Sequence, residues 1–178
     1  MPAAPTGPDP AAWWQLSARL FAGDEPAAAA LLAAQPALLS AANAAGETLL
    51  HATIREQRPA ALSWLLAQGA PVHATDQQGS TPLAVAVSLG QGDTTAPLLA
   101  AGAEPRARWR GRVPLVVLAA GQHQPAILAQ LLAAGANPDD TEPDGRHALD
   151  EAAELGHAEA LRQLLAAGAN PNPVNAQG

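Results

Sequence analysis

Apolar positions recur along this chain with a period of about 33 residues, a length known from stacked repeat proteins. The clearest copy is the block Leu-Leu-Ala-x-Gly-Ala, which closes an apolar run in four successive periods, with its glycine at Gly69, Gly102, Gly135 and Gly168. A repeat of this length predicts a stack of similar units, because one unit is too small to bury its own apolar face and must pack on its neighbours. The chain is therefore expected to form an open array of units.

Each period holds two helix-length stretches separated by a short break. In the last period, one helix is expected over residues 147–155 and a second over residues 158–167, with the break at Gly156 and His157. The second helix should end at Gly168, because glycine tolerates the positive φ that commonly follows a helix. The units are thus expected to be helix-turn-helix pairs.

Proline marks the start of the second helix in three units, at Pro26, Pro59 and Pro125. Its missing N–H loses no helical partner at that position. The third unit differs, because Pro97 lies inside the apolar stretch. We expect Asp93 to cap that helix, so that Pro97 falls in its first turn and the helix starts late or irregularly.

A second set of glycines precedes the first helix of each unit, at Gly46, Gly79, Gly111 and Gly145. These positions predict hairpin turns that need a positive φ. The step from Gly79 to Gly111 is one residue shorter than the step from Gly46 to Gly79, and the step from Gly111 to Gly145 is one residue longer. The hairpin before Gly111 is therefore short and the helical stretch after it long, so we expect a distorted loop between the helices of that unit, around residues 121–124.

The length of 178 residues fits one domain built in this way. The first ten residues hold four prolines, so residues 1–10 are expected to form a disordered arm. Residues 11–178 are expected to form five units. Their approximate bounds are 11–42, 43–75, 76–107, 108–141 and 142–178.

Charge and composition exclude several classes of function. The formal net charge is −7 and all nine basic residues are Arg, which argues against nonspecific nucleic-acid binding. The chain has no Cys, so a thiolate metal site or a Cys nucleophile is impossible. It also lacks a signal-peptide pattern and a membrane-spanning apolar run, so a cytoplasmic protein with no membrane partner is expected. The Ala-rich, Lys-free composition is typical of a high-GC bacterial source.

The repeat resembles the ankyrin repeat family, whose units have this period and carry the signature Thr-Pro-Leu-His-x-Ala. The best matches are Thr-Leu-Leu-His-Ala at residues 48–52 and Thr-Pro-Leu-Ala-Val-Ala at residues 81–86. This resemblance implies an all-α solenoid of about five helix-turn-helix units joined by hairpin-like loops. The first unit lacks the signature and looks like a divergent N-terminal cap.

The resemblance also implies a protein partner, bound through the hairpin tips and the concave face of the inner helices. Carried onto this sequence by register, the candidate residues are Glu47, Arg55, Glu56, Gln77, Gln78, Ser80, Ser88, Leu89, Trp109, Arg110, Arg112, Asp144, Arg146 and Glu154. Ala44, Ala45, Ala120 and Pro143 lie at matching register positions.

One hairpin concentrates basic charge. The basic hairpin, residues 106–112, holds Trp109 and four of the nine arginines, and both residue types are frequent in binding hot spots. The acidic hairpin, residues 139–144, follows it and carries four carboxylates. Two interpretations stay open: the two hairpins pair with each other in solvent and leave Trp109 to a partner, or the basic hairpin contacts an acidic partner or a nucleic acid.

The aromatic residues outside that hairpin favour structural roles. At least one of Trp13 and Trp14 should pack against the stack, and Trp64 should be half-buried. His51, at the signature position, is expected to hydrogen-bond the backbone of an adjacent hairpin, and His157 is expected to support a turn.

No candidate catalytic residue emerges from the remaining side chains. His73, His123 and His147 lie in separate units without a second His or a carboxylate at ligand spacing, so neither a zinc site nor a cofactor is expected. The serines have no nucleophile-elbow context. An enzyme is therefore not expected.

The leading hypothesis is a non-enzymatic module, monomeric, that binds a protein partner. A sharper version is an immunity-type inhibitor, in which this acidic stack masks a cationic toxin or effector. A structural alternative is a self-associating scaffold or a fragment of a longer array that extends beyond Gly178.

Overall fold

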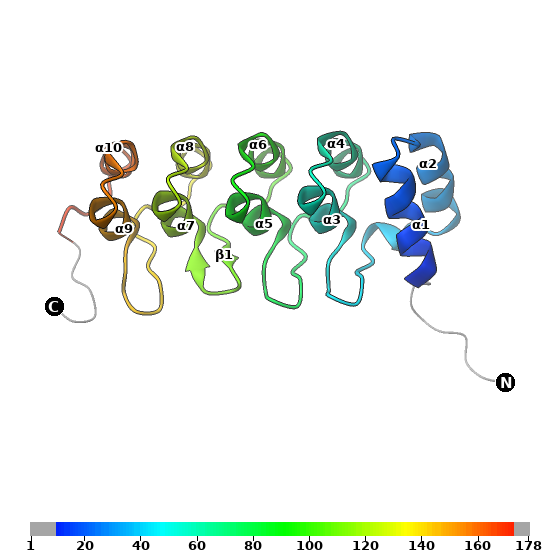
Figure 1. Cartoon of the computed structure of the whole chain (residues 1–178), viewed down its shortest axis with the longest axis horizontal. Helices are drawn as coiled ribbons and strands as arrows, with labels where there is room; N and C mark the ends of the chain where they lie inside the picture. The colour runs from blue at the N-terminus through cyan, green and yellow to red at the C-terminus, as the bar shows by residue number, and fades with distance from the viewer. Residues whose placement is uncertain (1–9, 173–178) are drawn as a thin grey trace.

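The computed structural model of the chain describes residues 10–172, in which five helix pairs lie side by side along the long axis (Figure 1). The first pair is α1 (Pro10–Phe21) and α2 (Glu25–Ala34), followed by the 3-10 helix η1 (Pro36–Leu39). The other pairs are α3 (Leu49–Arg55) with α4 (Pro59–Ala67), α5 (Pro82–Ser88) with α6 (Gly92–Ala100), α7 (Leu115–Gly121) with α8 (Pro125–Ala133), and α9 (Ala148–Glu154) with α10 (Ala158–Ala166). The all-α array of helix-turn-helix units is confirmed.

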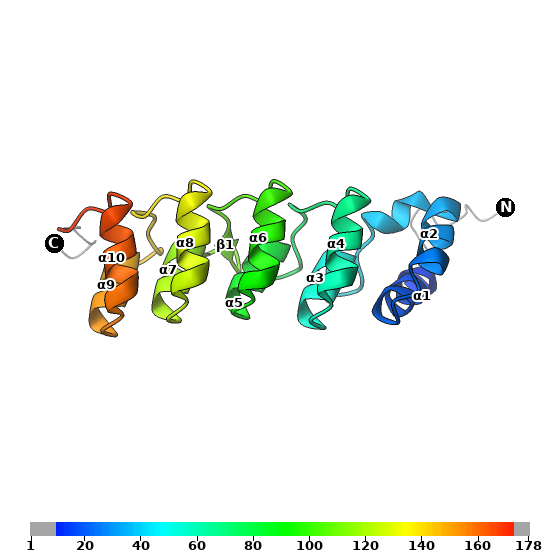
Figure 2. The same cartoon turned by 90° about the horizontal axis from the view of Figure 1, so that it is seen from above.

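From α3 onward, the odd-numbered helices form one layer and the even-numbered helices a second, and hairpins project beyond the odd layer (Figure 1, Figure 2). The first leucine of every Leu-Leu block is fully buried between the layers: Leu65, Leu98, Leu131 and Leu164, each 0% exposed. The second leucine is half-buried except in the last unit, where Leu165 is 49% exposed. The apolar core therefore runs continuously through the stack, and each second leucine depends on a following unit for cover.

The expectation of a late helix in the third unit is wrong. α6 begins at Gly92, one full repeat period after α4 begins at Pro59, and Asp93 is its second residue while Gln91 occupies the N-cap. Pro97 lies inside the helix and removes one backbone hydrogen bond. Burial of Leu98 (0% exposed) fixes the helix in the register of its neighbours, and this packing outweighs the local effect of proline.

The expected distortion of the fourth unit is also wrong. α7 and α5 each have seven residues, and Gln124 N donates to Ala119 O at 3.0 Å just as Gln91 N donates to Ala86 O at 3.0 Å. The loop between α7 and α8 thus closes like the loop between α5 and α6. The one-residue difference lies entirely within the basic hairpin.

A two-residue turn explains this difference. β1 (Arg108–Trp109) pairs antiparallel with β2 (Val113–Pro114), and Arg112 N donates to Trp109 O at 3.0 Å. Both central residues have positive φ, 50° at Arg110 and 65° at Gly111, as in a type I′ turn. In the preceding hairpin only Gly79 has a positive φ, of 78°, so the two glycines occupy different places in two kinds of turn.

The three tryptophans outside the basic hairpin lie as expected. Trp13 is 3% exposed and its Nε1 donates to Ala41 O at 3.2 Å, whereas Trp14 is 61% exposed. Trp64 is half-buried against the core. The predicted N-terminal arm lies outside the described residues except for Pro10, which begins α1.

Candidate protein-binding face

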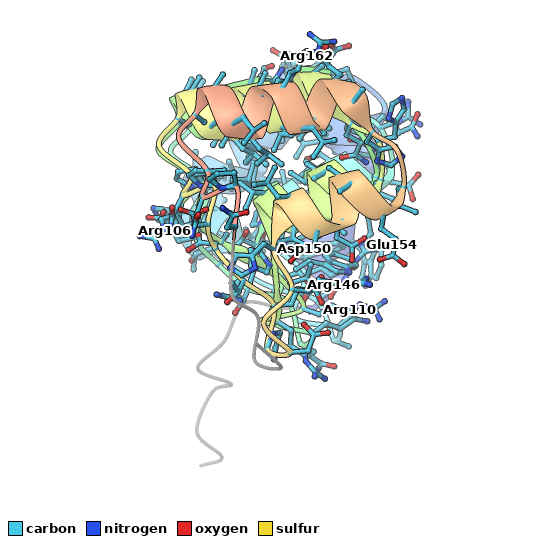
Figure 3. All side chains as sticks on the ribbon, turned by 90° about the vertical axis from the view of Figure 1, so that its left-hand side faces the viewer. Arg106, Arg110, Arg146, Asp150, Glu154 and Arg162 are labelled. Carbon is cyan, nitrogen blue, oxygen red and sulfur yellow. The ribbon has the colours of Figure 1, made fainter. Side chains whose placement is uncertain are left out.

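The candidate residues come from the odd-numbered helices, from the residues directly after them and from the hairpins. Figure 3 shows Arg110, Arg146 and Glu154 together on one side of the array, whereas Arg106 lies on the opposite side. The basic hairpin therefore divides its arginines between two faces of the molecule.

At the second and third units, the charged candidates bind one another. Arg55 Nε lies 2.5 Å from Glu47 Oε1, and Arg55 Nη2 lies 3.7 Å from Asp76 Oδ2. The other carboxylate oxygen of buried Asp76 accepts from Gln78 N and Ser80 N, both at 2.9 Å. The charges of Arg55 and Glu47 are thus balanced within the chain.

His51 ties this network to the third unit, as expected from its signature position. Its Nε2 donates to Ser80 O at 3.0 Å, while its Nδ1 accepts from Thr48 N at 3.2 Å. Burial lowers the pKa of His51, against the raising effect of the Ser80 bond and of the Asp76 and Glu47 carboxylates. A second proton on Nδ1 would break the contact with Thr48, so the neutral ring fits the site.

Two register-based candidates are buried and lie outside the exposed face. Ser80 is 0% exposed and its Oγ accepts from Arg110 N at 3.0 Å, so it fixes the position of the basic hairpin. Ala120 is also 0% exposed, because α7 presents that position to the core. Register alone could not distinguish these inward positions from the neighbouring outward ones.

The remaining candidates of these units reach solvent to different degrees. Glu56 and Gln78 are exposed, and Leu89 is 48% exposed. Gln77 is exposed, but its Nε2 donates to Ala44 O at 2.7 Å. Ser88 is half-buried and donates to Val85 O at 2.8 Å.

Two arginines of the basic hairpin are held by the acidic hairpin. Arg106 makes two hydrogen bonds to Asp140, at 2.8 and 3.2 Å, and the pairing raises the pKa of Arg106. Arg108 Nη1 donates to Arg112 O at 2.7 Å and to Thr141 O at 3.0 Å. The interpretation that the two hairpins pair is confirmed for this side of the molecule.

The other two arginines point elsewhere. Arg110 and Arg112 are exposed and have no carboxylate within ion-pair distance among residues 10–172. The guanidinium of Arg110 lies 5.2 Å from the ring centre of half-buried Trp109, a cation–π contact. An open cleft of about 400 Å³ separates these side chains from Glu142 and Asp144 on the acidic hairpin.

In the fifth unit, acidic residues of the hairpin and of α9 surround Arg146. Arg146 pairs with Glu151 and with Glu154, the latter at 2.8 Å, and these contacts raise its pKa. Burial and the charges of Asp144 and Glu151 raise the pKa of Glu142, although Arg146 and Arg112 act in the opposite direction. The cleft therefore has a basic wall and an acidic wall, which attract each other without forming an ion pair among the described residues.

One pair of histidines was not predicted from the sequence. His123 was expected to lie without a second His, yet its ring centre is 4.4 Å from that of His157. In the sequence, the two residues are separated by one residue more than the repeat period. This spacing places them at neighbouring positions of adjacent units and could have predicted the contact. His157 has the expected supporting role, since its Nδ1 donates to Ala120 O at 2.7 Å.

Sequence and structure comparisons identify the family. A family model described as ankyrin repeats, in three copies, matches residues 16–108 and 97–175. The chain belongs to the ankyrin repeat family. Ankyrin repeats are generally protein–protein interaction modules and typically have no enzymatic activity.

A solved structure supports the same fold for this ankyrin array. The crystal structure of an ankyrin repeat domain from Acinetobacter baumannii is similar, with a TM-score of 0.83 and 28% sequence identity. The match covers 93% of this chain and 86% of that one. No curated protein matches the sequence. Within residues 10–172 of the array, no helix has the length and apolarity needed to cross a bilayer.

Proposed function

We propose that this ankyrin array is a non-catalytic recognition module whose protein partner docks on the odd-numbered helices and the hairpin tips, with the basic hairpin at the centre. The observation that carries this proposal is which arginines form ion pairs within the chain. Arg55 and Arg146 each bind two carboxylates, whereas Arg110 and Arg112, beside Trp109, find none within the described chain. Exposed Arg next to a partly buried Trp is typical of the central residues of protein interfaces.

The surroundings of the basic hairpin fit the rim of such a contact. Leu89 adds an exposed apolar side chain in the preceding unit, and Glu56 and Gln78 add polar ones. On the other side, Asp144 and Glu154 supply negative charge. A polar rim around an aromatic and basic centre excludes water from the central contacts.

The hydroxyl groups of the two candidate serines support a non-catalytic role. Ser80 and Ser88 both bond to nearby backbone groups, which leaves neither oriented toward a base as a nucleophile requires. Recognition needs no such arrangement.

The test begins with in-cell crosslinking and mass spectrometry to identify the partner, followed by affinity measurement with the purified proteins. Trp109→Ala combined with Arg110→Ala is expected to weaken binding by about 30-fold or more, since hot-spot truncation typically removes at least about 2 kcal/mol. Arg106→Ala is the matched control, because Arg106 belongs to the same hairpin but binds Asp140 on the opposite side.

Equal affinity of the double variant and the unchanged protein would place the contact elsewhere. An equal loss in Arg106→Ala would show that the hairpin acts only through its shape. Crosslinking of the chain solely to itself would favour the scaffold alternative. Relief of a partner's toxicity by co-expression would establish the inhibitor form of this function.

A further inference from the structure

His123 and His157 meet on the edge of the array formed by the turns between helices. His123 lies between α7 and α8, and His157 directly precedes α10. Their ring centres are 4.4 Å apart and the ring planes are inclined by 46°. Two imidazoles from adjacent units are therefore in contact at the turns that join the helices of each pair.

The hydrogen bond of His157 sets its chemical form. Because Nδ1 donates to Ala120 O at 2.7 Å, the neutral ring carries its lone pair on Nε2. A backbone carbonyl bound to one ring nitrogen is the usual support for a His that ligates a metal ion through the other. The fold thus prepares one imidazole as a ligand.

The backbone of His123 is in the left-handed region, with φ of 56°. Gly90 and Gly156 occupy the same position in the adjacent units, with φ of 69° and 71°. A residue with a side chain adopts this conformation less readily than glycine does. Gln57, at the equivalent position of the second unit, has a similar φ of 52°. Positive φ at this position is therefore not specific to His123, and the evidence for a site is the contact between the two imidazoles.

The ring separation suits a shared ion. Metal–nitrogen bonds of about 2.0–2.1 Å place the centres of two imidazoles on one ion about 4.5 Å apart at a right angle and about 5.2 Å apart at a tetrahedral angle. The observed 4.4 Å is slightly shorter, so the exposed side chain of His123 has to turn outward to bring both ring nitrogens onto one ion. Imidazole ligands suit Zn²⁺, Ni²⁺ and Cu²⁺.

We propose that His123 and His157 bind a divalent late transition metal ion and leave its other coordination positions open. Among residues 10–172, no group of three or more His, Asp or Glu side chains is placed to hold an ion. Water or a group from a bound partner would complete the shell, so the ion would exchange more readily than in a four-ligand structural site. His123 also lines a groove of about 770 Å³ with Leu89 and Gln124, which gives such a group access.

The test titrates tag-free protein with Zn²⁺ at neutral pH, with calorimetry and NMR of the imidazole nitrogens as readouts. One ion per chain should bind, and the ring signals of His123 and His157 should shift. His123→Gly installs the residue that adjacent units carry, so the fold should be at least as stable while Zn²⁺ affinity falls at least about tenfold. His157→Gln should preserve the link between units, since Gln91 at the same register position donates to Ile54 O at 2.9 Å.

His73 provides the control, because it is exposed and lies in another unit. His73→Ala should bind Zn²⁺ as the unchanged protein does. Undiminished affinity in His123→Gly or His157→Gln would overturn the proposal and leave the ring pair as an aromatic contact only. Loss of binding in His73→Ala, or unshifted signals from the pair, would do the same.

Discussion

The hairpin over residues 76–80 and the basic hairpin over residues 106–112 occupy equivalent places in adjacent units, yet different contacts hold them. The first is tied to the unit before it by His51, which donates to Ser80 O, and by the pairing of Arg55 with Asp76. At the register positions of His51 and Asp76, the next unit has Ala84 and Trp109. Neither side chain can form these ties.

The basic hairpin instead closes mainly on itself. Its β1–β2 pair and its two-residue turn satisfy the backbone locally, and one bond from Arg110 N to Ser80 Oγ links it to the preceding hairpin. The first hairpin uses its charged side chain, Asp76, for stability, while the second leaves Arg110 and Arg112 exposed. One repeat period can therefore support a hairpin that stabilises the array and a hairpin that presents side chains for binding.

The largest expected effect comes from removing the carboxylate of the first hairpin. Asp76→Ala would leave the N–H groups of Gln78 and Ser80 without their acceptor, the second of them buried, and we expect the free energy of unfolding to fall by about 2 kcal/mol. Urea denaturation would measure this. Asp76→Asn is the control, because Asn43 Oδ1 accepts two backbone N–H groups, from Ala45 and Glu47, at the same place in the hairpin of the second unit. A loss in Asp76→Asn as large as in Asp76→Ala would make the ion pair with Arg55 the dominant contribution.

A smaller effect is expected from pH, through His51. Because burial lowers the pKa of His51 in the folded state, the unfolded chain binds a proton that the folded chain excludes once the pH falls below about 6.5. The contribution of His51 is complete above that pH and is lost progressively below it. Denaturation at pH 7.5 and 5.5 should show lower stability at pH 5.5, and the drop should shrink in His51→Gln. An unchanged drop in that variant would assign the effect to other groups.

The smallest expected effect on stability lies in the basic hairpin. Arg110→Asn places a residue that tolerates positive φ at the first turn position, so stability should rise by about 0.5 kcal/mol while partner affinity falls. Thermal unfolding and binding measurements on the same variant would check both signs. A loss of stability above about 1 kcal/mol would mean that the contact between Arg110 and Trp109 holds the hairpin together.

Periodicity predicted most of the fold, because packing imposes it. The helix pairs and the glycines after the second helices follow from apolar spacing, and Gly69 and Gly168 have φ of 80° and 87° as expected. Local rules failed where they competed with packing. Pro97 did not delay α6, and the shifted Gly111 changed the type of turn, not the length of the helices.

The candidate face was predictable by register, but the use of each side chain was not. The sequence placed Arg106 and Arg110 in one hairpin without indicating that they lie on opposite sides of it. Ser80 lay at an outward register position, yet its hydroxyl turned inward to the next hairpin. His123 and His157 come into contact because they are separated by one residue more than the repeat period. Examining each unit by itself does not reveal this spacing.

The burial of nearly all of α5 has a consequence for folding kinetics. Its residues from Leu83 to Val87 are each 0% exposed, and the hairpin before it is the one tied by His51. A linear array folds outward from whichever section first becomes stable alone. We expect that section to be the second and third units. The basic hairpin of the fourth unit would then become ordered only after the third unit, against which it packs, has folded.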